Sequence, residues 1–153
     1  MWSVVNFGKF AGKGFSLPQI LTKDPDYFFW GVDEGVFKWA LQREAEILAR
    51  RATAIKIPKG DDIGDCIQYW LTPDGKFSGF AVIDQTQPAH VGSSTEIRRP
   101  VLNLEMPRKI KGYDKLGCRL MRKTFKYHWF GDKNFTRARV EDFFSDARNF
   151  KNP

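Results

Sequence analysis

Residues 66–83 have the sequence CIQYWLTPDGKFSGFAVI. Two runs of mostly aromatic and aliphatic residues, 66–71 and 76–83, flank the tetrapeptide Thr72-Pro73-Asp74-Gly75. Proline presets φ within a turn, and glycine tolerates the positive φ that a turn often needs. The segment therefore predicts an antiparallel hairpin of two strands. Weak alternation over Glu96–Leu104 predicts a third strand, which Pro100 would place at an edge or a bulge.

The region before this sheet predicts a small hairpin followed by helices. Trp2–Phe7 and the segment at Phe15 predict two short strands joined by a Gly/Lys turn. Ser16 with Pro18, and Asp24 with Pro25, show the cap and proline pattern of helix N-termini. We expect the two short helices to end near residues 23 and 33. A longer helix is predicted over residues 38–51, with a buried stripe at Leu41, Ala45, Leu48 and Ala52.

The region after the sheet predicts two more helices. Tyr113–His128 shows helical periodicity, and we expect one of its faces to anchor it to the core. That face consists of Tyr113, Leu116, Leu120, Thr124 and Tyr127. Thr136 is a candidate cap for a final helix that reaches about Asn149. The predicted fold class is α+β, with a small N-terminal hairpin and short helices, a central antiparallel sheet and basic C-terminal helices.

The polar, glycine-containing loop 58–65 is the candidate boundary between two parts of the chain. It separates a hairpin-helix module over 1–57 from an antiparallel hairpin with a basic helical region over 58–153. At 153 residues we expect both parts to pack as one globular unit.

The composition is that of an ordinary globular protein, with 42% hydrophobic and 28% charged residues. Cys66 and Cys118 have no local partner, which favours buried free thiols in a reducing compartment. No apolar run approaches the roughly 20 residues of a membrane span. The N-terminal residues lack the pattern of a signal peptide. We therefore expect a cytoplasmic protein, or one that acts in the cytoplasm of a host cell, with no membrane partner.

The charge is unevenly distributed along the chain. Residues 98–153 contain 15 Lys and Arg against 6 Asp and Glu, whereas residues 1–97 contain 10 against 12. A tract of this kind repels itself and disfavours compaction, and it is usually tolerated because the partner is polyanionic. It predicts a nucleic-acid partner, either DNA or RNA.

Four cations of the tract recur at helical spacing on one face of the predicted basic helix. Neighbouring cations would widen the phosphate-binding footprint, and an aromatic side chain at the helix end would stack on unpaired bases. The predicted nucleic-acid-binding residues are Arg98, Arg99, Arg108, Lys109, Lys111, Lys115, Arg119, Arg122, Lys123, Lys126 and Trp129. The alternative interpretations are an acidic protein surface as the partner and a solvated basic face that binds nothing.

The Gly/Lys turn over residues 8–14 does not match a P-loop or a dinucleotide-binding fingerprint. Lys9 and Lys13 are nevertheless candidate phosphate contacts within this turn. The turn also belongs to a pattern that continues with Phe15, Leu17 and Asp24-Pro25-Asp26-Tyr27-x-x-Trp30.

This pattern over residues 5–40 resembles the "FGKYKG…L…DPxYLxW" module of exodeoxyribonuclease X-like proteins and of the quorum-sensing-regulated virulence factor family. Phe10 and Phe28 depart from the usual Tyr and Leu. The resemblance implies a compact hairpin with helices, often attached to DNA-processing proteins. It carries over no activity, because the acidic residues of the exonuclease lie outside the module. The general style of residues 58–153 suggests a phage or mobile-element protein.

Signatures of enzymes are missing from the sequence, so no catalytic residue, metal site or cofactor is predicted. His90 and His128 have no partner at metal-ligand spacing. The acidic residues Asp24, Asp26, Asp33 and Glu34 would be the candidates for Mg²⁺ in a nuclease, although Asp24 fits a helix cap better.

Three functions remain in order of preference. The first is a non-enzymatic nucleic-acid-binding accessory protein that is held mainly by phosphate contacts. The second is a phage-encoded inhibitor of a host defence or regulatory complex, of the anti-CRISPR kind, which binds an acidic host protein or a nucleoprotein complex. The third is a metal-dependent nuclease.

Overall fold

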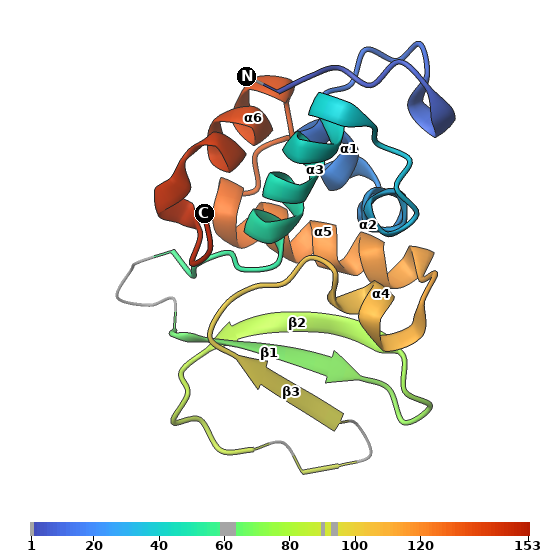
Figure 1. Ribbon diagram of the computed structural model, residues 1–153. Helices are drawn as coiled ribbons and strands as arrows, with labels where there is room; N and C mark the ends of the chain where they lie inside the picture. Colours follow the sequence, from blue (N-terminus) through green and yellow to red (C-terminus); the bar gives the residue numbers. More distant parts are fainter. Residues whose placement is uncertain (1, 59–63, 90, 93–94) are drawn as a thin grey trace.

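The computed structural model describes residues 2–58, 64–89, 91–92 and 95–153. Within these residues the chain has an α+β fold of six α-helices and a three-stranded antiparallel sheet, as the sequence predicts (Figure 1). The elements are the 3₁₀ helix η1 (Gly8–Phe10), α1 (Leu17–Lys23), α2 (Pro25–Asp33), α3 (Trp39–Ala52), β1 (Cys66–Leu71), β2 (Phe77–Ile83), β3 (Thr95–Arg99), α4 (Met106–Lys111), α5 (Lys115–Phe130), α6 (Arg137–Ser145) and the 3₁₀ helix η2 (Ala147–Asn149).

The predicted hairpin forms the β1–β2 pair, and β3 adds to the other side of β1, which gives the strand order β2-β1-β3. The turn closes where the N–H of Thr72 donates to the carbonyl of Lys76 at 2.8 Å, with Gly75 at φ +80°. The third strand is an edge strand, as predicted, but it ends at Arg99, directly before Pro100, so its predicted continuation to Leu104 was wrong. This agrees with the restriction that proline places on a sheet, since it has no N–H to donate.

Helix α5 lies in the middle of the molecule (Figure 1). The sheet packs below it, mainly through β2, and α1, α2, α3 and α6 lie on its other side. The core continues through both layers, because Tyr69 of β1, Phe125 of α5 and Phe28 of α2 are all almost fully buried. Burial of such large side chains supplies most of the stabilisation of a domain of this size.

The opposite face of the sheet carries a polar cluster. Gln68 and Arg98 are opposite each other in the β1–β3 register, and Gln68 donates to the carboxylate of Glu96. The Arg98 guanidinium donates to the carbonyls of Gln87 at 2.7 Å and Pro88 at 3.0 Å and pairs with Glu96 at 3.3 Å. Arg98 therefore fastens the segment after β2 to the sheet.

The predicted N-terminal hairpin is reduced to a single β-bridge between Val4 and Ser16, next to a hydrogen bond from the N–H of Val5 to the carbonyl of Phe15. The prediction of two strands was wrong at this point. Gly8, Gly12 and Gly14 all have positive φ, and the turn begins as the 3₁₀ helix η1, so the two arms do not extend together.

The helix starts predicted in the N-terminal half are confirmed. Ser16 and Gln19 form a capping box at α1, and Asp24 Oδ1 accepts the N–H of Tyr27 at 3.0 Å at the start of α2. Helix α3 begins one residue later than the predicted range and ends one residue after it. Its Ala45, Leu48 and Ala52 are buried as predicted, and Leu41 is partly buried.

Three of the five residues that were predicted to anchor α5 to the core are exposed, while Leu120 and Thr124 are partly buried. Tyr113, Leu116 and Tyr127 have 70%, 62% and 63% of their surface exposed. The helix is anchored instead by Gly117, Cys118, Met121 and Phe125. Phe125 decides the orientation, since its ring is surrounded by those of Trp129, Phe130, Phe135, Phe143 and Phe144.

The final helix is shorter than predicted. α6 starts after the Thr136 cap and ends at Ser145, and Ala147–Asn149 form η2. The two halves of the chain share one core, because Ile55 bridges both Leu102 and Phe150 and the indole of Trp2 donates to Ser145 Oγ at 2.8 Å. Of the predicted boundary loop 58–65, residues 59–63 lie outside the described part of the chain.

Candidate nucleic-acid interface

A pocket of about 280 Å³ opens between the N-terminal half of α5 and the junction of α1 with α2. It brings Lys9 of the Gly/Lys turn next to the basic face of α5, about a hundred residues later in the sequence. The pocket is lined by Lys9, Lys23, Asp24, Asp26, Tyr113, Lys115, Cys118, Arg119 and Arg122.

A second hollow of about 450 Å³ continues from the first along α5 toward its C-terminal end, and the two share Lys23, Arg119 and Arg122. It is lined by Lys23, Arg119, Arg122, Lys123, Lys126, Asp132, Asn134 and Phe135. The seven cations of the two hollows are called the basic surface below: Lys9, Lys23, Lys115, Arg119, Arg122, Lys123 and Lys126.

The carboxylates of these hollows are mostly neutralised by ion pairs. Asp24 pairs with Lys9, and Asp26 pairs with Arg108 at 3.1 Å. In the described part of the chain, no carboxylate lies within ion-pair distance of Lys115, Arg119, Lys123 or Lys126. Lys115, Arg119 and Lys123 are exposed and Lys126 is half-buried, and the charge of all four is uncompensated at close range and therefore available to phosphates.

Arg122 is the half-buried member of the basic surface. Its Nε donates to the carbonyl of Thr22 near the end of α1, and its guanidinium lies 6.0 Å from the ring of Phe135. Burial lowers the pKa of Arg122 below its usual value. Arg122 thus fixes α5 against α1 and keeps Lys23 beside Arg119 and Lys123.

The two lysines of the Gly/Lys turn have different surroundings. Lys9 pairs with Asp24, and this hydrogen bond raises the pKa of Lys9 above its usual value. Its ammonium also lies 5.6 Å from the ring of Phe10. Lys13 is exposed in the turn and is not among the residues that line the two hollows.

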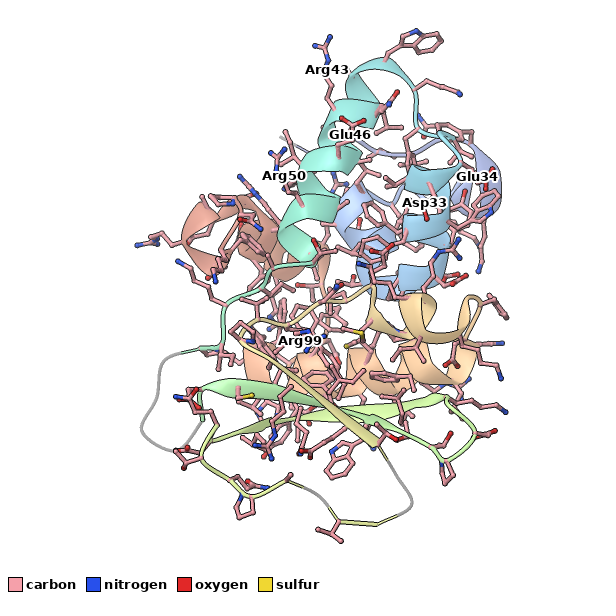
Figure 2. The ribbon with its side chains drawn as sticks, turned by 60° about the horizontal axis from the view of Figure 1, so that its bottom comes forward. Asp33, Glu34, Arg43, Glu46, Arg50 and Arg99 are labelled. Atoms are coloured by element: carbon pink, nitrogen blue, oxygen red, sulfur yellow. The ribbon has the colours of Figure 1, made fainter. Side chains whose placement is uncertain are left out.

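Besides Lys13, five predicted phosphate contacts lie outside the basic surface. Arg98 is held by carbonyls of the segment after β2, and Arg99 is an exposed residue at the end of β3 (Figure 2). Arg108 pairs with Asp26 and, at 3.8 Å, with Asp33. Lys109 lies 3.9 Å from Glu105 within α4, and Lys111 is exposed at the end of that helix.

Trp129 is partly buried against the core and lies within α5, whereas the sequence predicted that the helix ends at His128. Its indole N–H donates to the carbonyl of Lys56 at 2.9 Å, and its ring lies 5.6 Å from Phe125 and 6.1 Å from Phe80. This side chain belongs to the contact between α5 and the sheet. The next residue, Phe130, also remains in α5, which ends at Gly131 in the left-handed conformation.

Three of the four candidate metal ligands, Asp24, Asp26 and Asp33, have structural partners. Asp24 caps α2, Asp26 is buried against Arg108, and Asp33 and Glu34 lie at the end of α2 (Figure 2). Among the described residues, no three His, Cys, Asp or Glu side chains are grouped as a metal site. His90 lies outside the described part, and burial lowers the pKa of His128.

Both thiols are buried and free, as the sequence predicts. Cys118 lies at the floor of the first pocket, where burial and the nearby charge of Asp26 raise its pKa to about 12. A thiol with this pKa stays protonated at neutral pH and is a poor nucleophile.

Sequence reasoning missed Lys23, Tyr113 and Tyr127 as surface residues of this site. Lys23 is the last residue of a short helix, and no local pattern links it to α5. The tyrosines were assigned to the core, although Cys118, Met121 and Phe125 form an equally regular apolar stripe on the same helix.

The chain matches no protein-family model, no curated protein and no solved structure. None of the helices in the described residues is both long and apolar enough to span a bilayer.

Proposed function

We propose that this protein is a non-enzymatic nucleic-acid-binding protein that holds its ligand through phosphate contacts on the basic surface. One observation carries the proposal: cations from η1, α1 and α5 meet around two connected hollows. Self-repulsion among them disfavours folding, and a polyanion relieves it.

The surface suits a chain of phosphates better than one small anion. Lys115 and Lys126 are 11 residues apart on α5, which corresponds to roughly 17 Å along the helix axis. The cations between them follow one side of the helix, so they can contact successive phosphates. None of them belongs to a buried pocket that would select a particular base.

The direct test is a fluorescence anisotropy titration with a labelled oligonucleotide at 50–200 mM salt. If about five phosphates are neutralised, the log–log slope of affinity against salt is about −3.5 for a single strand and about −4.5 for a duplex. Absence of binding at 50 mM salt to DNA and to RNA would overturn the proposal.

A protein partner is the second candidate, and one observation favours it. Trp39 at the start of α3 is 88% exposed and has φ +54°, a backbone conformation that bulky residues rarely adopt. Exposed tryptophans frequently become the anchors of protein interfaces. This function predicts a stoichiometric complex that survives nuclease treatment and dissociates with Trp39→Ala. Nuclease treatment that releases the partner would exclude it.

A further inference from the structure

Two exposed tyrosines stand beside the basic surface near the two ends of α5. Tyr113 precedes the helix by two residues and Tyr127 lies in its last turn, with 70% and 63% of their surface exposed. Leu116 and the partly buried Leu120 lie between them along the sequence. The buried residues of α5 are Gly117, Cys118, Met121 and Phe125, so burial in the core does not account for the two tyrosine rings.

Each tyrosine borders one hollow of the surface. Tyr113 lines the first pocket with Lys9 and Lys115. Tyr127 lines a third hollow of about 430 Å³ between α5 and β2, together with Phe80, Leu120 and Lys123. The third hollow shares Lys123 and Asp132 with the second, so the three hollows follow one another across α5.

Aromatic and cationic groups therefore alternate along one path. The path starts at Tyr113, passes Arg119 and Lys123, and ends at Tyr127. The helix between Lys115 and Tyr127 is roughly 18 Å long, which suits a binding site of a few nucleotides. Rings that are exposed beside cations match a ligand whose apolar faces and negative charges are both accessible.

Resting on the function proposed above, we propose that the ligand is a single-stranded nucleic acid, with unpaired bases stacked on Tyr113 and Tyr127 and phosphates on the cations between them. A duplex stacks its bases on one another and offers the rings nothing to stack on. A single strand presents the π-face of every base, and stacking on aromatic side chains tolerates any sequence. The Tyr127 ring has an edge contact with His128 at 4.9 Å and is still 63% exposed.

The test compares three labelled probes by anisotropy at one salt concentration: a 12-nucleotide oligodeoxythymidine, a 12-nucleotide oligouridine and a 12-base-pair DNA duplex. We expect at least one single strand to bind about tenfold more tightly than the duplex. Tyr113→Ala and Tyr127→Ala should each weaken single-strand binding by about 5- to 100-fold and leave duplex binding unchanged. Tyr113→Phe and Tyr127→Phe keep the ring and should retain the affinity.

Trp39→Ala is the matched control, because it removes an even more exposed aromatic ring from α3, and α3 lines none of the three hollows. It should leave the affinity unchanged, and all variants should keep the thermal midpoint of the wild type. Equal affinity for duplex and single strand, or Ala variants that bind single strands like the wild type, would overturn this inference while leaving the proposed function standing. Failure of every probe to bind at low salt would instead overturn both.

Discussion

Arg108 of α4 pairs with Asp26 of α2, with Nη1 and Oδ1 3.1 Å apart and most of both side chains shielded from water. The sequence offered Arg108 as a phosphate contact and Asp26 as a metal ligand. The structure joins the two, and each neutralises the other. A buried charge is destabilising when its partner is missing. The ion pair therefore favours the packing of α4 against α2.

Arg108→Ala should therefore affect folding rather than binding. It leaves the carboxylate of Asp26, 9% exposed, without its partner, and we expect a loss of about 2 kcal/mol in the free energy of unfolding. Urea denaturation measures this loss. Arg99→Ala is the control, since Arg99 is exposed on an edge strand, and it should change stability by less than about 0.5 kcal/mol. Normal stability of Arg108→Ala combined with weakened binding would assign Arg108 to the interface instead.

Arg119→Ala and Lys123→Ala should weaken nucleic-acid binding without changing stability. Each removes one exposed cation of the basic surface, so the log–log salt slope should become shallower by about 0.7 on a single strand. Arg43→Ala and Arg50→Ala remove the same kind of charge from α3, where both side chains are exposed away from the hollows (Figure 2). Equal loss of affinity in both pairs of variants would indicate a response to net charge alone.

Asp132→Asn should strengthen binding. Asp132 lies where the second and third hollows meet and is the exposed carboxylate on the proposed path. Removing a like charge at a solvent-exposed site corresponds to roughly 0.5–1 kcal/mol, or about two- to fivefold in affinity. Asparagine accepts the left-handed backbone of this position, which has φ +61°. An unchanged or lower affinity would show that the ligand does not pass this residue.

Tyr69→Phe should make the free energy of unfolding less dependent on pH at alkaline pH. Burial raises the pKa of Tyr69 from about 10 to about 12, so the folded state keeps a proton that the unfolded state releases. The contribution of the protonated Tyr69 to stability is complete below pH 10 and is lost as the pH rises to 12. Between pH 10 and pH 12 the free energy of unfolding should fall more steeply for the wild type than for the variant, by up to about 1.4 kcal/mol per pH unit.

The same substitution also has a cost at neutral pH. The hydroxyl accepts the N–H of Asn103 at 2.8 Å, and losing this acceptor should lower the free energy of unfolding by about 1–2 kcal/mol. Urea titrations at pH 7, 10 and 11 separate the two effects. Cys118, whose pKa also rises to about 12, continues to titrate in the variant and explains a residual slope. Parallel pH profiles for both proteins would refute the assignment to Tyr69.

The sequence by itself determined the elements whose signals are local. The turn at Thr72–Gly75 and the caps at Ser16 and Asp24 depend on neighbouring backbone geometry, so the β1–β2 hairpin and the starts of the two short helices follow from nearby residues. The class of the fold, and the excess of cations in the last third of the chain, are equally readable from the sequence.

Only the tertiary structure decided which cations meet and which face of α5 is exposed. Helix α5 carries two apolar stripes of similar quality, and the choice between them depends on the phenylalanines of 130–150, which pack around Phe125. That choice turns Tyr113 and Tyr127 outward and places Lys23 beside Arg119. Packing between distant segments depends on all the side chains of the core. The periodicity of apolar residues within one helix does not identify the segment against which that helix packs.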